Sequence, residues 1–251
     1  MLEINKIYHG DCLEIMQQIP DETIDMVITS PPYNLQIEYN SYEDNLSKED
    51  YLTWCARWIG KCADLLKDGG RIAINIPIES NIGDKWFMFN DYINLLNSFG
   101  LIQTAFIIWY KTQVTSRTAW GSWLSPSCPS INQPCECILV YSKGTRKKEG
   151  NPKLIDITNK EFVEWTLGVW NMQAELNRTH PAPFPVELPA RLMKLYTYQQ
   201  DIILDPFMGS GTTAIACSEF KRNFIGIEMD EKYYKMATER VNDYNRQLKL
   251  W

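Results

Sequence analysis

The chain has 251 residues, of which 45% are hydrophobic and 22% are charged, so it can bury one substantial core. Glycine and proline number 13 each, which excludes collagen-like and disordered compositions. The 25 basic and 31 acidic side chains give a net charge of −6. This balance argues mildly against nucleic-acid binding but permits a local basic face. We expect one globular domain over residues 1–251.

Several classes of protein are excluded at this level. No apolar stretch approaches the roughly twenty residues of a membrane helix, and the N-terminus lacks the regions of a signal peptide. The seven cysteines include no Cys-x-x-Cys pair, so we expect reduced, mostly buried thiols. Two histidines are too few for a His-rich metal centre and disfavour Ser-His-Asp hydrolysis. We therefore expect a cytoplasmic protein with no membrane association and no metal site.

The predicted elements alternate between strands and helices. The first half is predicted as strand 4–8, helix 12–18, strand 24–29, helix 52–66, strand 71–76, helix 86–97, and strands 105–110 and 137–141. The second half is predicted as helix 186–198, strand 202–205, a helix opening at 209–213, strand 224–228 and a terminal helix. Asp68-Gly69-Gly70 is expected to end the second helix, and residues 143–179 receive no assignment. Such alternation predicts an open, mostly parallel sheet that binds ligands at the carboxyl ends of its strands.

A glycine-containing turn, Asp205-Pro206-Phe207-Met208-Gly209-Ser210-Gly211-Thr212-Thr213, joins a predicted strand to a helix. Its glycines allow the backbone to approach a ligand. Glu228 ends the next strand, seventeen residues after Gly211, where a carboxylate can accept hydrogen bonds from both ribose hydroxyls of a nucleoside cofactor. No lysine follows the glycines, so a phosphate-binding loop is a poor match. The turn leaves NAD and S-adenosylmethionine both open.

A second turn, Ser30-Pro31-Pro32-Tyr33, directly follows the buried strand at 24–29. Its prolines fix φ and remove two N–H donors, which leaves a rigid rim with a hydroxyl, carbonyl oxygens and one ring. Ser30 Oγ and the Pro31 carbonyl can accept the two hydrogens of an exocyclic amino group and so release its lone pair, while Tyr33 stacks on the base. The competing interpretation is a rigid turn with Tyr33 in the core.

Together the two turns resemble the motifs of the DNA amino-methyltransferases, which methylate cytosine or adenine at the exocyclic amino group. The resemblance covers nearly the whole chain, and the catalytic motif precedes the cofactor motif, as in the β group of that family. It implies a Rossmann-like, S-adenosylmethionine-dependent α/β fold with circularly permuted motif order and a mostly parallel sheet with a terminal antiparallel hairpin. It implies catalytic roles for Ser30, Pro31, Pro32 and Tyr33, and cofactor contacts from Asp205, Phe207, Gly209, Ser210, Gly211, Thr212, Thr213 and Glu228.

The resemblance also implies which residues contact the methionine end and the adenine end of the cofactor. Phe184 and Pro185, in the proline-rich segment after His180, should pack near its methionine end. Because the motif order is permuted, the first strand should lie beside strand 224–228, so that Asp11 accepts a hydrogen bond from the adenine amino group and the Cys12 N–H faces a ring nitrogen. The competing role for Asp11 is a helix N-cap.

Target recognition is expected from a small insertion within residues 112–179. Loop 116–123 and the basic stretch 143–153 are candidate contacts with double-stranded DNA. The competing interpretations are a packed, tryptophan-rich loop for 116–123 and a solvated loop for 143–153. Residues 34–50 resemble a mobile lid. Cys135 is rejected as the nucleophile of a carbon-methylating enzyme because it opens a later, antiparallel strand. The resemblance leaves open whether the chain forms a homodimer or works with a restriction endonuclease.

The interpretation that best joins these features is a site-specific DNA methyltransferase acting on a flipped base. Serine at the first position of the catalytic turn is the more frequent family choice for cytosine N4, with adenine N6 as the alternative. An RNA or protein-glutamine methylase is disfavoured by Ser30 and by the permuted order. A nicotinamide-dependent oxidoreductase is disfavoured because no acid or base for hydride transfer is evident, and a catalytically silent DNA-binding module is the remaining alternative.

Overall fold

The computed structural model describes residues 2–34, 46–79, 86–112, 121–131, 133–174 and 184–248. Most of the predicted lid, the first part of loop 116–123 and the segment 180–183 lie outside the described residues. The strands are β1 (Lys6–His9), β2 (Ile24–Thr29), β3 (Leu66–Pro77), β4 (Ile102–Lys111), β5 (Cys135–Ser142), β6 (Val169–Met172), β7 (Ile202–Asp205) and β8 (Asn223–Glu228). The helices are α1 (Cys12–Ile15), α2 (Lys48–Leu65), α3 (Met88–Ser98), α4 (Asn159–Trp165), α5 (Glu187–Tyr196), α6 (Thr212–Glu219) and α7 (Glu231–Leu248), with 3-10 helices η1 (Met16–Gln18) and η2 (Pro152–Leu154).

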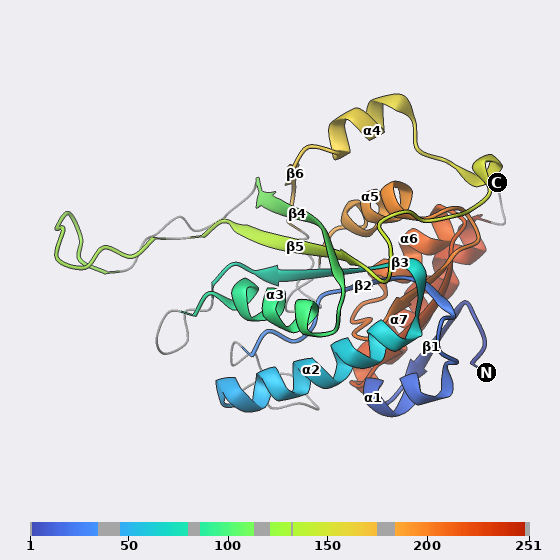
Figure 1. The fold of residues 1–251 in the computed structure, drawn as a ribbon, viewed down its shortest axis with the longest axis horizontal. Coiled ribbons are helices and arrows are strands. Elements are labelled where there is room, and N and C mark those ends of the chain that lie inside the picture. Colours follow the sequence, from blue (N-terminus) through green and yellow to red (C-terminus); the bar gives the residue numbers. More distant parts are fainter. Residues whose placement is uncertain are drawn as a thin grey trace.

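Within these residues the strands form one eight-stranded sheet in the order β1-β8-β7-β2-β3-β5-β4-β6 (Figure 1). The first five strands in that order are parallel, and β5 runs antiparallel to both β3 and β4. The predicted parallel sheet, its antiparallel hairpin and the pairing of the first strand with strand 224–228 are confirmed. The hairpin is not the end of the sheet, however, because β6 pairs in parallel with β4 beyond it.

The order of the strands reverses between β7 and β2. From β7 the chain continues through α6 to β8 on one side, whereas from β2 it continues through α2 to β3 on the other side. In open α/β sheets the crevice at such a point, outside the carboxyl ends of the strands, is where ligands bind. Both predicted turns lie there, since Ser30 directly follows β2 and Pro206 directly follows β7.

Helices cover both faces of the sheet. The six residues of β2 are all buried, as expected for a central parallel strand with both faces covered. One core layer packs α2 and α3 against the sheet, and the predicted helical face contributes Cys55, Ile59 and Cys62 to it. A second layer packs residues of α5, α6 and α7 against the other face. No helix in the described ranges has both the length and the apolar content needed to cross a bilayer.

The predicted stop signal Asp68-Gly69-Gly70 does not separate the second helix from the following strand. Helix α2 ends at Leu65, and β3 begins at once with Leu66. The glycines lie instead where the register between β2 and β3 shifts, because the step from Ile24 to Met26 on β2 is matched by the longer step from Leu66 to Arg71 on β3, an irregularity of the kind that β-bulges introduce. Gly69 has φ +71°, and a Cβ there would lie 2.5 Å from the Lys147 carbonyl oxygen. A bulge and a helix stop both favour glycine, so the sequence did not distinguish them.

Within the basic stretch 143–153, Lys148 is largely buried in ion pairs, whereas Arg146, Lys147 and Lys153 are exposed, and a DNA contact by these residues stays a prediction. Lys148 Nζ lies 2.7 Å from Asp25 Oδ1 and 3.3 Å from Asp201 Oδ2, and its side chain is only 10% exposed. Burial by itself would raise the pKa of Asp25, but hydrogen bonds from the Ile202 N–H, Lys148 and Lys67 lower it. Asp25 is at the start of β2 and Asp201 precedes β7. These charges therefore join strands at the amino edge of the sheet, opposite the two turns.

The region 133–174, for much of which the sequence predicts no element, contains α4 and β6. Helix α4 begins with a capping box in which Thr158 and Glu161 exchange side-chain and backbone hydrogen bonds. Strand β6 alternates exposed and buried residues, and Trp170 and Met172 face the core. Four residues are too few for this alternation to be recognised reliably in sequence, so only pairing with β4 identifies the strand.

The connection between β4 and β5 carries a projecting segment, residues 121–131, which we call the finger. It extends away from the rest of the fold on the side where β4 ends (Figure 1). A bridge between Gly121 and Pro129 closes its tip. The tip contains no charged residue, and Trp123 and Leu124 are 79% and 90% exposed. Large apolar side chains exposed together suggest a contact surface rather than a folding core.

Candidate functional site

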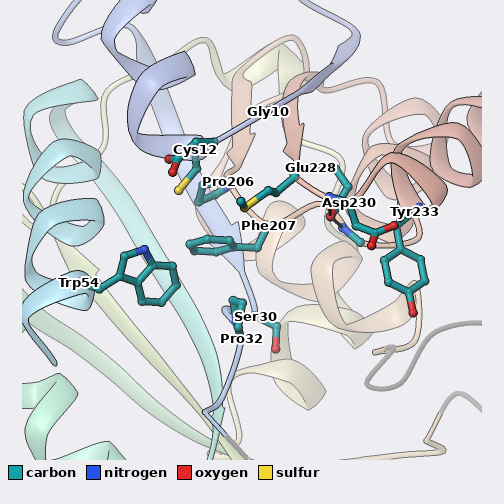
Figure 2. A pocket seen from close by; sticks show the side chains of 13 residues that line it. Gly10, Cys12, Ser30, Pro32, Trp54, Pro206, Phe207, Glu228, Asp230 and Tyr233 are labelled. Atoms are coloured by element: carbon teal, nitrogen blue, oxygen red, sulfur yellow. Dashed lines mark hydrogen bonds between the residues drawn. The ribbon is translucent and has the colours of Figure 1, made fainter. Parts of the chain in front are cut away.

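A cavity of about 290 Å³ opens where β1, β8, β7 and β2 end (Figure 2). Helices α2 and α7 complete its wall. The lining residues are Gly10, Asp11, Cys12, Ser30, Pro32, Trp54, Pro206, Phe207, Gly209, Glu228, Met229, Asp230 and Tyr233. The structure thus brings the two turns and the start of the chain together at the switch point of the sheet, as the permuted order predicted.

Glu228 is held in this cavity by two main-chain hydrogen bonds. Its Oε2 accepts from the Gly209 N–H at 2.7 Å, and its Oε1 accepts from the Asp230 N–H at 2.8 Å. Burial raises the pKa of Glu228, and these bonds offset part of the rise. A carboxylate has about four acceptor positions, so both oxygens keep lone pairs after these contacts. The group can therefore still accept two hydroxyl donors, which fits the ribose of a nucleoside cofactor.

Asp11 lies at the end of β1, which pairs with β8 so that His9 is opposite Glu228. Its Oδ1 accepts from the Leu13 N–H at 2.6 Å, so the predicted N-cap of α1 is confirmed. The neighbouring Cys12 is buried, and this burial raises the pKa of its thiol to about 12. Cys12 is therefore a neutral, apolar part of the wall and no nucleophile.

Asp205 lies beneath the cavity and is not among the residues that line it. Its Oδ1 accepts from Thr29 Oγ1 at 2.8 Å and from the Phe207 N–H at 3.1 Å, and its Oδ2 accepts from Thr213 Oγ1 at 2.6 Å. The carboxylate therefore joins β7 to β2 and to the start of α6. Asp205 and Thr213 hold the glycine turn in shape and do not form the cavity surface.

Ser210, Gly211 and Thr212 of the glycine turn are also set back from the cavity surface. Gly211 has φ +83°, and a Cβ there would lie 3.2 Å from Ala237 Cβ on α7, so this position requires glycine for backbone and packing reasons. Arg240 Nη1 donates to the Ser210 carbonyl at 3.1 Å and to Thr212 Oγ1 at 3.3 Å. These contacts fix the turn against α7 and leave Phe207 and Gly209 to face the cavity.

In the other turn, Ser30 faces the cavity and Tyr33 lies behind it. Ser30 Oγ is hydrogen bonded to the Tyr33 hydroxyl and donates to the Asn75 carbonyl at 3.1 Å. Tyr51 donates to the Pro32 carbonyl at 2.7 Å and so anchors the turn to α2. Tyr33 is only 5% exposed, which agrees with the core position considered as the competing interpretation. Its stacking on a base stays a prediction.

Six residues that line the cavity were not among the predicted site residues: Gly10, Trp54, Pro206, Met229, Asp230 and Tyr233. The ring centroids of Trp54 and Phe207 are 5.4 Å apart, and in Figure 2 the two rings form one apolar side of the cavity. Asp230 Oδ1 accepts from the Lys232 and Tyr233 N–H groups at 2.9 and 3.1 Å. An aspartate just before the terminal helix is an N-cap signal, so it could have placed Asp230 and Tyr233 near Glu228.

Phe184 and Pro185 do not line this cavity. Phe184 packs against the core layer formed with α5, α6 and α7. Pro185 lines a separate hollow with Thr112 and Asn171, near the ends of β4 and β6. The residues just before them, 175–183, lie outside the described part of the chain. Their predicted place at the methionine end of the cofactor stays a prediction.

A protein-family model identifies the family to which a chain with this fold and cavity belongs. The family model described as DNA methylase, of the N6 and N4 type, matches residues 24–239. The chain belongs to this family. It is an S-adenosylmethionine-dependent DNA methyltransferase that acts on an amino group. The wall of the cavity contains a carboxylate, an N-cap and two aromatic rings, and these groups fit a nucleoside cofactor of this kind.

Individual relatives agree with this assignment. The chain is 40% identical over 157 residues to the Type II methyltransferase M.MjaVI of Methanocaldococcus jannaschii, covering 62% of this chain and 80% of that protein. A solved structure from Thermus thermophilus, provisionally described as a DNA modification methylase in complex with S-adenosyl-L-methionine, has a TM-score of 0.76, 25% identity and 95% coverage of both chains. The cytosine-N4-specific PvuII DNA methyltransferase shares the fold, with a TM-score of 0.74, 20% identity and coverage of 96% of this chain and 91% of that one.

Substitution of Asp205 by asparagine should change how stability depends on pH. Burial raises the pKa of Asp205 from 3.8 to about 6, so the folded state holds this proton more tightly than the unfolded chain. The Asp205 contribution to the free energy of unfolding therefore falls, by roughly 2–3 kcal/mol, as pH rises from about 4 to about 6. Asp205→Asn keeps the size of the side chain and should lack this fall. Urea unfolding at intervals between pH 4 and pH 7 measures the difference, and identical pH profiles for the two proteins would contradict it.

Proposed function

We propose that this chain transfers the methyl group of S-adenosylmethionine to N4 of a cytosine within a specific sequence of double-stranded DNA. The observation that carries the proposal is the position of the Ser30 hydroxyl at the cavity wall. A hydroxyl has one proton to donate, and the Asn75 carbonyl, which can only accept, takes it at 3.1 Å. Tyr33 then donates to Ser30 Oγ in the contact between the two hydroxyls, and the second lone pair of Ser30 Oγ is left to accept from an amino N–H, as methylation of an exocyclic amino group requires.

The cofactor supplies a methyl group bonded to a positively charged sulfur. On this chain, Glu228 would accept hydrogen bonds from its ribose hydroxyls, and Asp11 would face its adenine from the end of β1. Phe207 and Trp54 offer the apolar surface that an adenine ring needs. The Pro31 carbonyl would be the second acceptor for the amino group of the base.

The target base must leave the DNA stack to reach this site. Ser30 lies within a cavity of about 290 Å³, and an amino group inside a paired duplex cannot enter it. Turning a base out costs a few kcal/mol, which contacts at the active-site wall have to offset. Serine at the first position of the turn, the more frequent choice among the cytosine N4 enzymes of the family that the two turns resemble, favours cytosine N4 over adenine N6.

We place recognition of the DNA sequence in the insertion 112–179, and within it in the finger. The connection that carries the finger begins after Lys111, at the end of β4, on the same edge of the sheet as Ser30. Its tip exposes Trp123 and Leu124 without any charge. Apolar side chains of this kind can enter a groove or press between base steps, and phosphate contacts must then come from other residues.

Plasmid DNA incubated with the protein and S-adenosylmethionine and then digested to nucleosides should contain N4-methylcytosine. Ser30→Ala should lower the rate of methylation by about 100-fold or more, because the acceptor for the amino proton is lost, with cofactor binding retained. Ser98→Ala, on the exposed end of α3, is the matched control and should behave as wild type. Mass spectrometry of the nucleosides identifies which base, if any, carries the methyl group. N6-methyladenine would refute the target atom, and the absence of any methylated base would refute the function.

Glu228→Ala should weaken the binding of S-adenosylmethionine by about 10- to 100-fold, because two hydrogen bonds to a charged acceptor are lost. Its effect on DNA affinity should be smaller. Glu231→Ala removes a fully exposed carboxylate three residues away and should leave both affinities unchanged. Isothermal titration calorimetry measures the two affinities, and equal cofactor affinity in Glu228→Ala and wild type would remove Glu228 from the site.

Replacing Trp123 and Leu124 together by serine should weaken DNA binding about tenfold, which corresponds to about 1.4 kcal/mol of lost contact. Both side chains are largely exposed, so the thermal stability and the cofactor affinity should not change. Ile155→Ser, at an exposed apolar position beside η2, serves as the control. Fluorescence anisotropy with a labelled duplex gives the affinities, and unchanged binding in the finger variant would show that recognition lies elsewhere.

A further inference from the structure

A hollow of about 660 Å³ lies where β4 and β6 end, beside the start of α5. The polar residues that line it are Thr112, Asn171, Gln173 and Glu187. Strands β4 and β6 run in the same direction as β2 and β3, so the hollow opens at the same edge of the sheet as Ser30. Sequence analysis predicted no element here and gave the two amides no role.

The amides of Asn171 and Gln173 are exposed at this edge. Strand β6 alternates exposed and buried residues, so Trp170 and Met172 face the core while Asn171 is exposed, and Gln173, which follows the strand, is exposed as well. Neither amide has a side-chain hydrogen-bond partner within the part of the chain that the structure describes. A side-chain amide has two N–H donors and one carbonyl acceptor. The two residues therefore offer donors and acceptors to a ligand at this edge.

The segment that carries the amides is fixed to the rest of the fold. The Arg191 guanidinium on α5 lies 5.4 Å from the ring of Trp165, at the end of α4, and 5.4 Å from the ring of Trp170 in β6. Lys194 Nζ, also on α5, lies 2.5 Å from Glu161 Oε1 on α4. Cations over aromatic rings are stabilising, more so when they are desolvated, and the Arg191 side chain is only 7% exposed. Groups that are held in place before binding lose little freedom on contact, which suits them to select one geometry.

The chemistry of the hollow favours the bases of DNA over its phosphates. None of its described lining residues is basic, whereas phosphate contacts depend on lysine and arginine. Glu187 is paired with Arg191 at 2.5 Å, so its charge is compensated. The amide of asparagine or glutamine matches adenine in the major groove, because it can accept from N6 and donate to N7 at the same time.

The hollow also lies at a suitable distance from the target base. Four steps between neighbouring strands, from β2 through β3, β5 and β4 to β6, separate it from Ser30. At about 4.8 Å a step this is roughly 19 Å, or about five to six base pairs at about 3.4 Å each. The finger cannot supply the same discrimination, because the Leu124 side chain has no polar atom and that of Trp123 has a single N–H donor.

We propose that Asn171 and Gln173 read adenine in at least one A·T pair of the recognition sequence. Their carbonyl oxygens accept from adenine N6 and their N–H groups donate to adenine N7. They are specificity-determining residues, and the finger adds contact area. This inference rests on the proposed function, because it names the part of the DNA substrate that the same enzyme recognises beyond the target base.

The test compares the base preferences of the wild type and of the double variant Asn171→Ala/Gln173→Ala. Each protein is mixed with S-adenosylmethionine and a library of duplexes of random sequence, and the bound duplexes are sequenced. The wild type should select a sequence with at least one A·T pair at which the double variant discriminates about 10- to 100-fold less. Preferences at the other positions should persist. Cofactor affinity and thermal stability should not change, because both side chains are exposed.

A matched control and a second double variant separate base readout from a structural role. Asn97→Ala removes an exposed amide in the last turn of α3, at the opposite edge of the sheet, and should keep the wild-type preferences. Asn171→Asp/Gln173→Glu keeps the size of the side chains but replaces their N–H donors by acceptors. Its preference should move from adenine to cytosine, because adenine N7 can only accept whereas cytosine N4 donates. A structural role would not change which base is preferred.

Four results would overturn the proposal: a wild-type sequence without an A·T pair, unchanged preferences in the alanine variant, a loss of binding in that variant that is equal for all sequences, or an acidic variant that still prefers adenine. The proposed function is tested separately, by the methylated nucleosides rather than by the bound duplexes. A wild type that forms N4-methylcytosine together with any of the four results refutes the role of the two amides alone.

Discussion

The carboxylate of Asp205 joins the two halves of the sheet at the point where the strand order reverses. Its hydrogen bonds to Thr29 on β2, to Thr213 on α6 and to the Phe207 N–H fix both turns relative to each other. The main-chain ladder between β7 and β2 has two residue pairs, so this contact adds to a short pairing at the carboxyl ends of the two strands. Because the carboxylate is fully desolvated, burial disfavours its charge, and the hydroxyl donors partly compensate. The geometry of the cavity depends on this group, although the group does not face it.

Two sets of strands contribute different parts of the site. Strands β1, β8 and β7 present Asp11, Glu228 and Phe207, which suit a nucleoside cofactor. Strand β2 presents Ser30, and behind it the strands β3, β5 and β4 add Asn75, Glu136 and Lys111. The antiparallel strand β5 is therefore more than an edge of the fold. It carries Glu136, whose carboxylate accepts from Tyr33 and Asn75 behind Ser30, and its connection to β4 extends into the finger.

Most strands could be predicted because their residues interact locally. Residues 24–29 and 202–205 form buried apolar runs that end in turn-forming residues, and both strands have the predicted bounds. The bulge at Gly69, the short strand β6 and the buried ion pairs of Lys148 could not be predicted in the same way. Each depends on a partner distant in sequence, such as Lys143 for the bulge or Asp25 for Lys148. Composition does not reveal that Lys148, within the basic stretch 143–153, is already paired with Asp25.

The sequence by itself determined the family, the fold and the two turns of the site, because Ser30-Pro31-Pro32-Tyr33 and the glycine turn with Glu228 are contiguous motifs with local backbone requirements. Only the tertiary structure decided which motif residues reach the cavity and which support it from below, as Asp205 and Thr213 do. It alone placed Trp54 and Tyr233 in the wall and Glu136 behind Tyr33. The physical reason is that these contacts join residues on different strands and helices. Sequence periodicity shows which face of an element is buried, whereas the folded sheet determines which side chain of another element meets it.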